Sequence, residues 1–84
     1  MRLNEPRIAP LRDDAATDAQ REVLAPFVAR KADYNIFRTM AHHPGAFDRF
    51  LKWANYILSQ YNSLAERTRE LAILRTGFNC GSGY

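Results

Sequence analysis

The hydrophobic positions after Pro44 have the clearest period in the chain. Apolar residues recur there at steps of three and one, which places them on one face of a helix: Phe47, Phe50, Leu51, Ala54, Ile57, Leu58 and Tyr61. Proline suits the first turn of a helix, where its missing N–H costs no hydrogen bond. The pattern predicts an amphipathic helix over about residues 45–61.

Two capping boxes predict two further helix starts. Thr17-Asp18-Ala19-Gln20 and Ser63-Leu64-Ala65-Glu66 each place a hydroxyl at the cap and an amide or carboxylate three residues later. The helices they open are predicted over about residues 18–30 and 64–79. Pro26 lies inside the first and predicts a kink or an early stop. The second carries an apolar stripe and is followed by glycines that are typical of helix exits.

Short segments complete the predicted organisation. A helical face over about residues 36–43 follows Asn35, a candidate cap, and is ended by Pro44. Residues 1–14 contain two prolines and no period, so we expect an extended arm. The sequence shows no strand-like alternation and no internal repeat. We therefore expect an all-α fold, a small bundle of about four helices in a single domain over residues 1–84.

Composition and charge exclude several classes of function. The chain is 46% hydrophobic and 25% charged, the balance of an ordinary globular domain. The net charge of +3 comes from dispersed arginines and argues against a nucleic-acid partner. The sequence contains neither a signal-peptide pattern nor an apolar run of about 20 residues. We expect a cytoplasmic protein with no membrane partner.

Glu70 is the first candidate for chemistry. At about 100° per residue it lies towards the apolar arc of the last predicted helix, near Ile73, Leu74 and Gly77. A partly desolvated carboxylate would have a raised pKa, which suits a proton-transfer group. The structural alternative is an ion pair with Arg67 or Arg75, or with a neighbouring subunit.

Cys80 is the second candidate and the single cysteine of the chain. A lone cysteine excludes an intramolecular disulfide and a multi-cysteine zinc site. Only the thiolate is nucleophilic, and a position just after a helix C-terminus disfavours that anion. The structural alternative is a small, partly buried side chain.

Two further groups carry weaker signals. His42 and His43 point about 100° apart on a helix and lack a partner at i+3 or i+4, so the sequence predicts no metal site. Trp53 and Tyr56 face away from the main stripe of their helix. With Phe37 they would form either a second apolar surface for a subunit interface or ordinary packing under the arm.

Two segments together resemble a known family. Asn-Ile-Phe-Arg-Thr-Met-Ala-His-His-Pro at residues 35–44, followed by Phe47, Phe50 and Leu51, resembles the early helices of carboxymuconolactone decarboxylase-like proteins. Arg-Thr-Arg-Glu-Leu-Ala-Ile-Leu-Arg at residues 67–75 resembles the helix that opens their core motif. The resemblance covers about residues 6–84. It implies an all-α, homo-oligomeric protein that needs no cofactor.

The resemblance also implies a peroxidase motif from which this chain departs. The alkylhydroperoxidase-like branch carries Glu, eleven residues, Cys-x-x-Cys, three residues and His, in which the cysteines reduce peroxides while Glu and His relay protons. With Glu70 in the glutamate position, Ser82 replaces the first cysteine, and the other two groups fall after Tyr84. With Cys80 as the first cysteine instead, Gly83 and Thr68 replace the second cysteine and the glutamate.

Three functions follow as hypotheses, with Glu70, Cys80 and Ser82 as candidate catalytic residues. The chain is expected to be a peroxide-reducing oxidoreductase that lacks the usual cysteine pair. The alternatives are a cofactor-free decarboxylase of a lactone acid, or a non-catalytic helical oligomerisation module. The apolar stripe of the last helix would need a cover. We therefore expect either a homo-oligomer or a longer subunit of which these residues are the front part.

Overall fold

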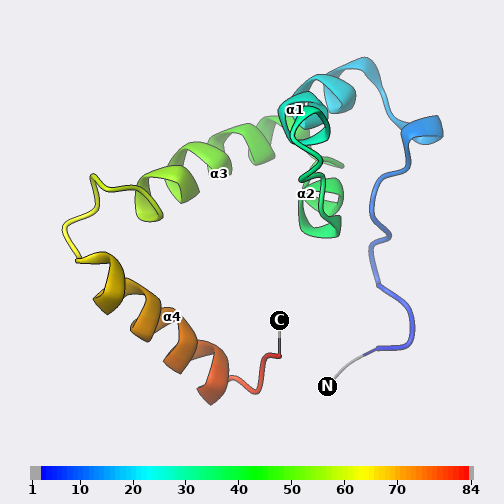
Figure 1. Cartoon of the computed structure of the whole chain (residues 1–84). Helices are drawn as coiled ribbons and strands as arrows, with labels where there is room; N and C mark the ends of the chain where they lie inside the picture. Colours follow the sequence, from blue (N-terminus) through cyan, green and yellow to red (C-terminus); the bar gives the residue numbers. More distant parts are fainter. Residues whose placement is uncertain (1–2, 84) are drawn as a thin grey trace. The chain divides into compact units, whose positions relative to one another are not determined.

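The computed structural model describes residues 3–83 and confirms the all-α prediction, since these residues form helices and connections but no strand (Figure 1). The elements, in chain order, are the 3-10 helix η1 (Asp13–Ala15), α1 (Asp18–Ala29), α2 (Asn35–Met40), α3 (Pro44–Ile57) and α4 (Glu66–Asn79). None of the helices in this described part combines the length and apolar content needed to cross a membrane. The chain divides into two compact units, Met1–Lys52 and Trp53–Tyr84.

The first unit contains all the buried side chains of the described residues. Its core consists of Leu11, Leu24, Ala41 and Phe47. Phe27, on α1, stacks on Phe37 and Phe47 with ring centroids 4.3 and 5.8 Å away, so three aromatic rings join α1, α2 and α3. Phe47 of the predicted periodic face thus lies in one small aromatic core, whereas Phe50, Leu58 and Tyr61 of that face are exposed.

Arg38 fastens the N-terminal arm to this core. Its Nη1 donates to the carbonyl oxygen of Leu11 at 3.0 Å and to Oδ1 of Asp13 at 2.9 Å, while Nη2 donates to Oδ2 of Asp33 at 2.6 Å. The N–H of Leu11 returns a hydrogen bond to the carbonyl of Arg38 at 3.1 Å. The predicted arm therefore ends in a buried leucine and in η1. Its first two residues, Met1 and Arg2, lie outside the described residues.

Helix α1 confirms the first capping box. The N–H of Gln20 donates to Thr17 Oγ1 at 3.3 Å, and the N–H of Thr17 donates to Gln20 Oε1 at 2.9 Å. Pro26 lies inside α1, which continues to Ala29. Arg30 Nε donates to the carbonyl of Pro26 at 3.1 Å, which satisfies a carbonyl near the helix end.

The ends of α2 and α3 correct the predicted boundaries. Helix α2 begins at Asn35 with Tyr34 as N-cap, so Asn35 is not the cap, and it ends at Met40 rather than at residue 43. Helix α3 begins at Pro44, as expected, but ends at Ile57 rather than at residue 61. The amide of Asn62 donates to the carbonyl of Ile57 at 2.8 Å, and this side-chain bond replaces the next helical one.

The second capping box is wrong. Helix α4 begins at Glu66, two residues later than predicted, and its N-cap is Ala65, which offers no side-chain acceptor. Asn62 Oδ1 accepts a hydrogen bond from the N–H of Leu64 at 2.8 Å. This Asx turn places Ser63 and Leu64 before the helix and not within it.

The Asp33–Arg38 pair predicts a pH dependence of stability. The hydrogen bond from Arg38 holds the pKa of Asp33 below its ordinary value of 3.8. A carboxylate with a depressed folded-state pKa stabilises the fold above its unfolded-state pKa, and this contribution is lost as the pH falls through the folded-state pKa. We expect Asp33→Asn to lower the thermal midpoint of unfolding at pH 7, and the difference from wild type to shrink below about pH 4.

The matched control is Asp14→Asn, because Asp14 pairs with Arg12 and both side chains are largely exposed. Its thermal midpoint should stay close to that of wild type across the same pH range. A wild-type midpoint equal to that of Asp33→Asn at pH 7 would contradict this account of Arg38.

Candidate functional site

Helix α4 positions Glu70 next to a buried guanidinium. Oε1 of Glu70 lies 3.8 Å from Nε of Arg69, and the Glu70 side chain is 53% exposed. The structural alternative considered from sequence paired Glu70 with Arg67 or Arg75 within the chain. Among the described residues, the ion pair is instead with Arg69.

Arg69 is largely buried, although α4 as a whole is exposed. Its side chain is 11% exposed, and Nη1 donates to the carbonyl oxygen of Ser59 at 3.3 Å. Nε is buried and has no hydrogen-bond partner among the described atoms, so the Glu70 carboxylate is its nearest counter-charge. The α3–α4 loop therefore fixes a permanent positive charge against the helix that carries Glu70.

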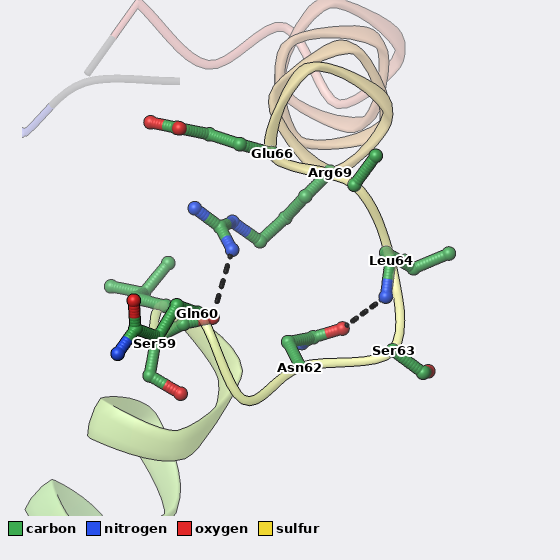
Figure 2. A pocket seen from close by; sticks show the side chains of 9 residues that line it. Ser59, Gln60, Asn62, Ser63, Leu64, Glu66 and Arg69 are labelled. Atoms are coloured by element: carbon green, nitrogen blue, oxygen red, sulfur yellow. Dashed lines mark hydrogen bonds between the residues drawn. The ribbon is translucent and has the colours of Figure 1, made fainter.

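A polar pocket of about 650 Å³ lies at this place, between the α3–α4 loop and the first turns of α4 (Figure 2). Arg69 projects into it, with Asn62 and Ser63 on the loop side and Glu66 on the helix side. Ala65 leaves the first-turn N–H groups of α4 without a side-chain acceptor. The pocket can thus offer N–H donors to a small polar molecule.

The structure does not bring the three sequence candidates together. Cys80 is an exposed free thiol at the C-cap of α4. Ten residues at a rise of 1.5 Å place it about 15 Å from Glu70 along the helix axis. Ser82 lies two residues beyond Cys80, so neither group can share a reacting atom with Glu70 of the same chain.

The predicted exit from α4 is confirmed at Gly81. This glycine has a positive φ of 65°, its N–H donates to the carbonyl of Phe78 at 3.1 Å, and the N–H of Ser82 donates to the carbonyl of Gly77 at 2.9 Å. These two bonds form a Schellman motif. The motif fixes the backbone at Cys80 and Ser82, so both residues are held at the C-terminal end of α4.

Each of the two histidines has a structural role. Nε2 of His42 lies 2.8 Å from the carbonyl oxygen of Ala9, on the arm. Nδ1 of His43 accepts a hydrogen bond from the N–H of Ala46 at 3.3 Å, so its ring caps the start of α3. Across residues 3–83, no group of three or more histidine, cysteine or carboxylate side chains is placed to hold a metal ion.

Sequence reasoning missed both His43 as a cap and Arg69 as a buried residue. The signal for His43 was its place directly before Pro44, where an acceptor side chain can reach the N–H of the third helical residue, Ala46. Arg69 had no such signal. Helix α4 carries three arginines, Arg67, Arg69 and Arg75. Arg69 differs from the other two in its hydrogen bond to the Ser59 carbonyl, which nothing in the local sequence indicates.

The aromatic candidates separate between the two units. Phe37 belongs to the stacked core of the first unit, whereas Trp53 and Tyr56 are 61% and 55% exposed. On α4, Leu71, Leu74 and Phe78 line a shallow apolar hollow of about 420 Å³ together with Arg75. The exposed stripe predicted for this helix is therefore present.

Comparison of the chain with protein-family models, with curated proteins and with solved structures gives no match. The family resemblance therefore depends on the residues of the two segments that carry it.

The start of α4 gives a direct test of the corrected cap. We expect Ala65→Asp to stabilise the protein by about 1 kcal/mol, because an aspartate at the N-cap accepts a first-turn N–H and favours the positive end of the helix dipole. Ser63→Ala should change stability by less than about 0.5 kcal/mol, because Ser63 does not cap the helix. Urea unfolding of the two variants checks both values, and a larger loss for Ser63→Ala would restore the original capping box.

Proposed function

We propose that this chain is a carboxymuconolactone decarboxylase/alkylhydroperoxidase-like subunit that reduces peroxides and uses Glu70 as its proton-transfer group. The all-helical fold agrees with this proposal. The segment at residues 67–75, on which the resemblance depends, forms the first part of α4. The proposal places the reaction at the Glu70 carboxylate and not at a bound cofactor.

The observation that carries the proposal is the pairing of Glu70 with Arg69. Helix α4 holds two carboxylates, Glu66 and Glu70, and among the described residues only Glu70 lies within ion-pair distance of an arginine. The arginine is anchored at the other end of its guanidinium by the Ser59 carbonyl. This anchoring restricts the direction of the Glu70 carboxylate while half of that side chain remains open to a substrate.

The chemistry needs a thiol as the reductant. A thiolate attacks one peroxide oxygen, the O–O bond breaks, and the departing alkoxide takes a proton to become an alcohol. The resulting sulfenic acid then condenses with a second thiol to form a disulfide, and this step releases water. Cys80 lies about 15 Å from Glu70 along α4 and cannot share a reacting atom with it. A small-molecule dithiol therefore supplies both the attacking thiolate and the second thiol that closes the cycle.

A second candidate reaction is the cofactor-free decarboxylation of a lactone acid. The polar pocket favours it, because a guanidinium and the free N–H groups at a helix N-terminus both suit a substrate carboxylate. The decarboxylation releases carbon dioxide and leaves a carbanion that must be protonated. Glu70 would then supply that proton, and Cys80 would have no part in the reaction.

Self-association is part of the proposal. The described part of the second unit buries no side chain, and nine large apolar residues are 46–77% exposed there: Trp53, Tyr56, Leu58, Tyr61, Leu64, Leu71, Ile73, Leu74 and Phe78. Aromatic side chains alone have about 150–250 Å² each, so this set exposes on the order of 1,000 Å² per chain. That area is what one partner contributes to a stable interface. It also supports the alternative of a non-catalytic oligomerisation module.

Substitution of Glu70 separates these functions. We expect Glu70→Gln to reduce the consumption of an organic hydroperoxide with dithiothreitol by about 100-fold or more, because a general acid contributes at least that factor. Glu66→Gln is the matched control on the same helix and should retain the activity. Cys80→Ser should retain the activity, because the dithiol supplies the attacking thiol at Glu70.

Three outcomes change the proposal. Peroxide consumption that Cys80→Ser abolishes and Glu70→Gln leaves unchanged would move the reaction from Glu70 to the Cys80 thiol. Release of carbon dioxide from a lactone acid, lost with Glu70→Gln, would establish the decarboxylase instead. If the folded protein turns over neither a hydroperoxide nor a lactone acid, the non-catalytic oligomerisation module is favoured.

A further inference from the structure

The exposed stripe of α4 has the residue pattern of one seam of a coiled coil. Leu71, Leu74 and Phe78 recur at steps of three and four, which are the a and d positions of a heptad. They are 55%, 67% and 77% exposed. Glu70 directly precedes this seam and Arg75 follows its central leucine, so a negative and a positive side chain flank it on opposite sides.

We infer that α4 pairs in parallel with α4 of a second copy, so that the partner subunit's Arg75 faces Glu70. In a parallel pair, the residue before an a position lies opposite the residue after the next d position of the other helix. These are positions 70 and 75 here. A two-fold axis along the pair repeats the contact, so each copy contributes one glutamate and one arginine to two equivalent ion pairs.

The charges of the chain favour this arrangement over the antiparallel one. Among the described residues, Arg75 has no carboxylate within ion-pair distance, and its guanidinium lies over the Phe78 ring, 5.6 Å from the ring centroid. The contact from Glu70 to Arg69 is 3.8 Å, longer than a hydrogen bond. Both side chains can therefore take a second partner. An antiparallel pair that overlaps the same seam would instead bring the two Arg75 side chains together at its centre and leave Glu70 without an arginine across the pair.

The seam has defined ends. One turn before Leu71 the same stripe is occupied by Arg67, which would meet its own copy across the axis. After Phe78 the helix ends at Asn79 and the chain turns at Gly81. The contact therefore spans the segment from Glu70 to Phe78, which is also the segment that holds the candidate catalytic carboxylate.

This inference rests on the self-association proposed above and deepens it, because it makes the site at Glu70 depend on a residue of the partner subunit. The charge pattern favours a second copy of this chain as the partner that covers the seam. The stripe and its two flanking charges are self-complementary under a two-fold axis, and an isologous interface requires a surface of that kind. An unrelated helix would have to reproduce the same register and the same charges.

Charge reversal tests the register. We expect Glu70→Arg and Arg75→Glu, each alone, to raise the dimer dissociation constant about tenfold, because two attractive pairs become two repulsive ones. An equimolar mixture of the two variants should recover the wild-type affinity, since the mixed pair matches arginine with glutamate at both places. Glu66→Arg, on the same helix but outside the seam and its flanks, is the matched control. Sedimentation equilibrium gives the constants, and far-UV circular dichroism checks that each variant is helical.

The outcomes separate the inference from the proposal on which it rests. A wild-type protein that stays monomeric over the whole concentration range overturns both the self-association and the α4 pairing. Self-association that the two reversals leave unchanged overturns only the pairing through α4. Weakening by each reversal without recovery in the mixture also overturns the parallel register, because the two positions then do not face each other.

Discussion

The guanidinium of Arg38 is the interaction on which the first unit depends. It joins the carbonyl of Leu11 to the carboxylates of Asp13 and Asp33, three groups that come from the arm and from the loop before α2. Because Leu11 is one of four buried side chains in the core, the arm is part of the hydrophobic interior. Hydrogen bonds to a charged group are stronger than neutral ones. Because this core is so small, the hydrogen bonds of Arg38 are needed to hold the arm against it.

Within residues 53–83, the second unit shows no comparable cluster of charged hydrogen bonds. Arg69 is hydrogen-bonded there to the loop carbonyl of Ser59 and not to a cluster of carboxylates. The apolar side chains of α4 remain exposed in the described residues, and hydrophobic stabilisation depends on the area that is removed from water. The helix that carries the candidate site therefore lacks the packing that stabilises α1 and α3. A partner surface would supply it.

The sequence was informative where a local pattern agreed with its surroundings. The Thr17 box, the proline at the start of α3 and the glycine after α4 each act within a few residues, and the structure contains all three. The prediction of the Ser63 box failed because Asn62 and Leu64 form an Asx turn there, and the four-residue motif takes no account of the residue before it. The buried state of Arg69 also depends on a carbonyl ten residues earlier. Glu70 was a candidate from the sequence, but its ion pair with Arg69 was not predicted.

We infer that the first unit is stabilised by its own core, whereas α4 is stabilised by a second copy. Amide hydrogen exchange measured at several protein concentrations tests this difference, because protection reports local opening. We expect protection of the amides of Leu71, Leu74 and Phe78 to rise with concentration, while that of Leu24 and Phe47 stays constant. Protection of α4 that does not change with concentration, in a range where the chain associates, would contradict it.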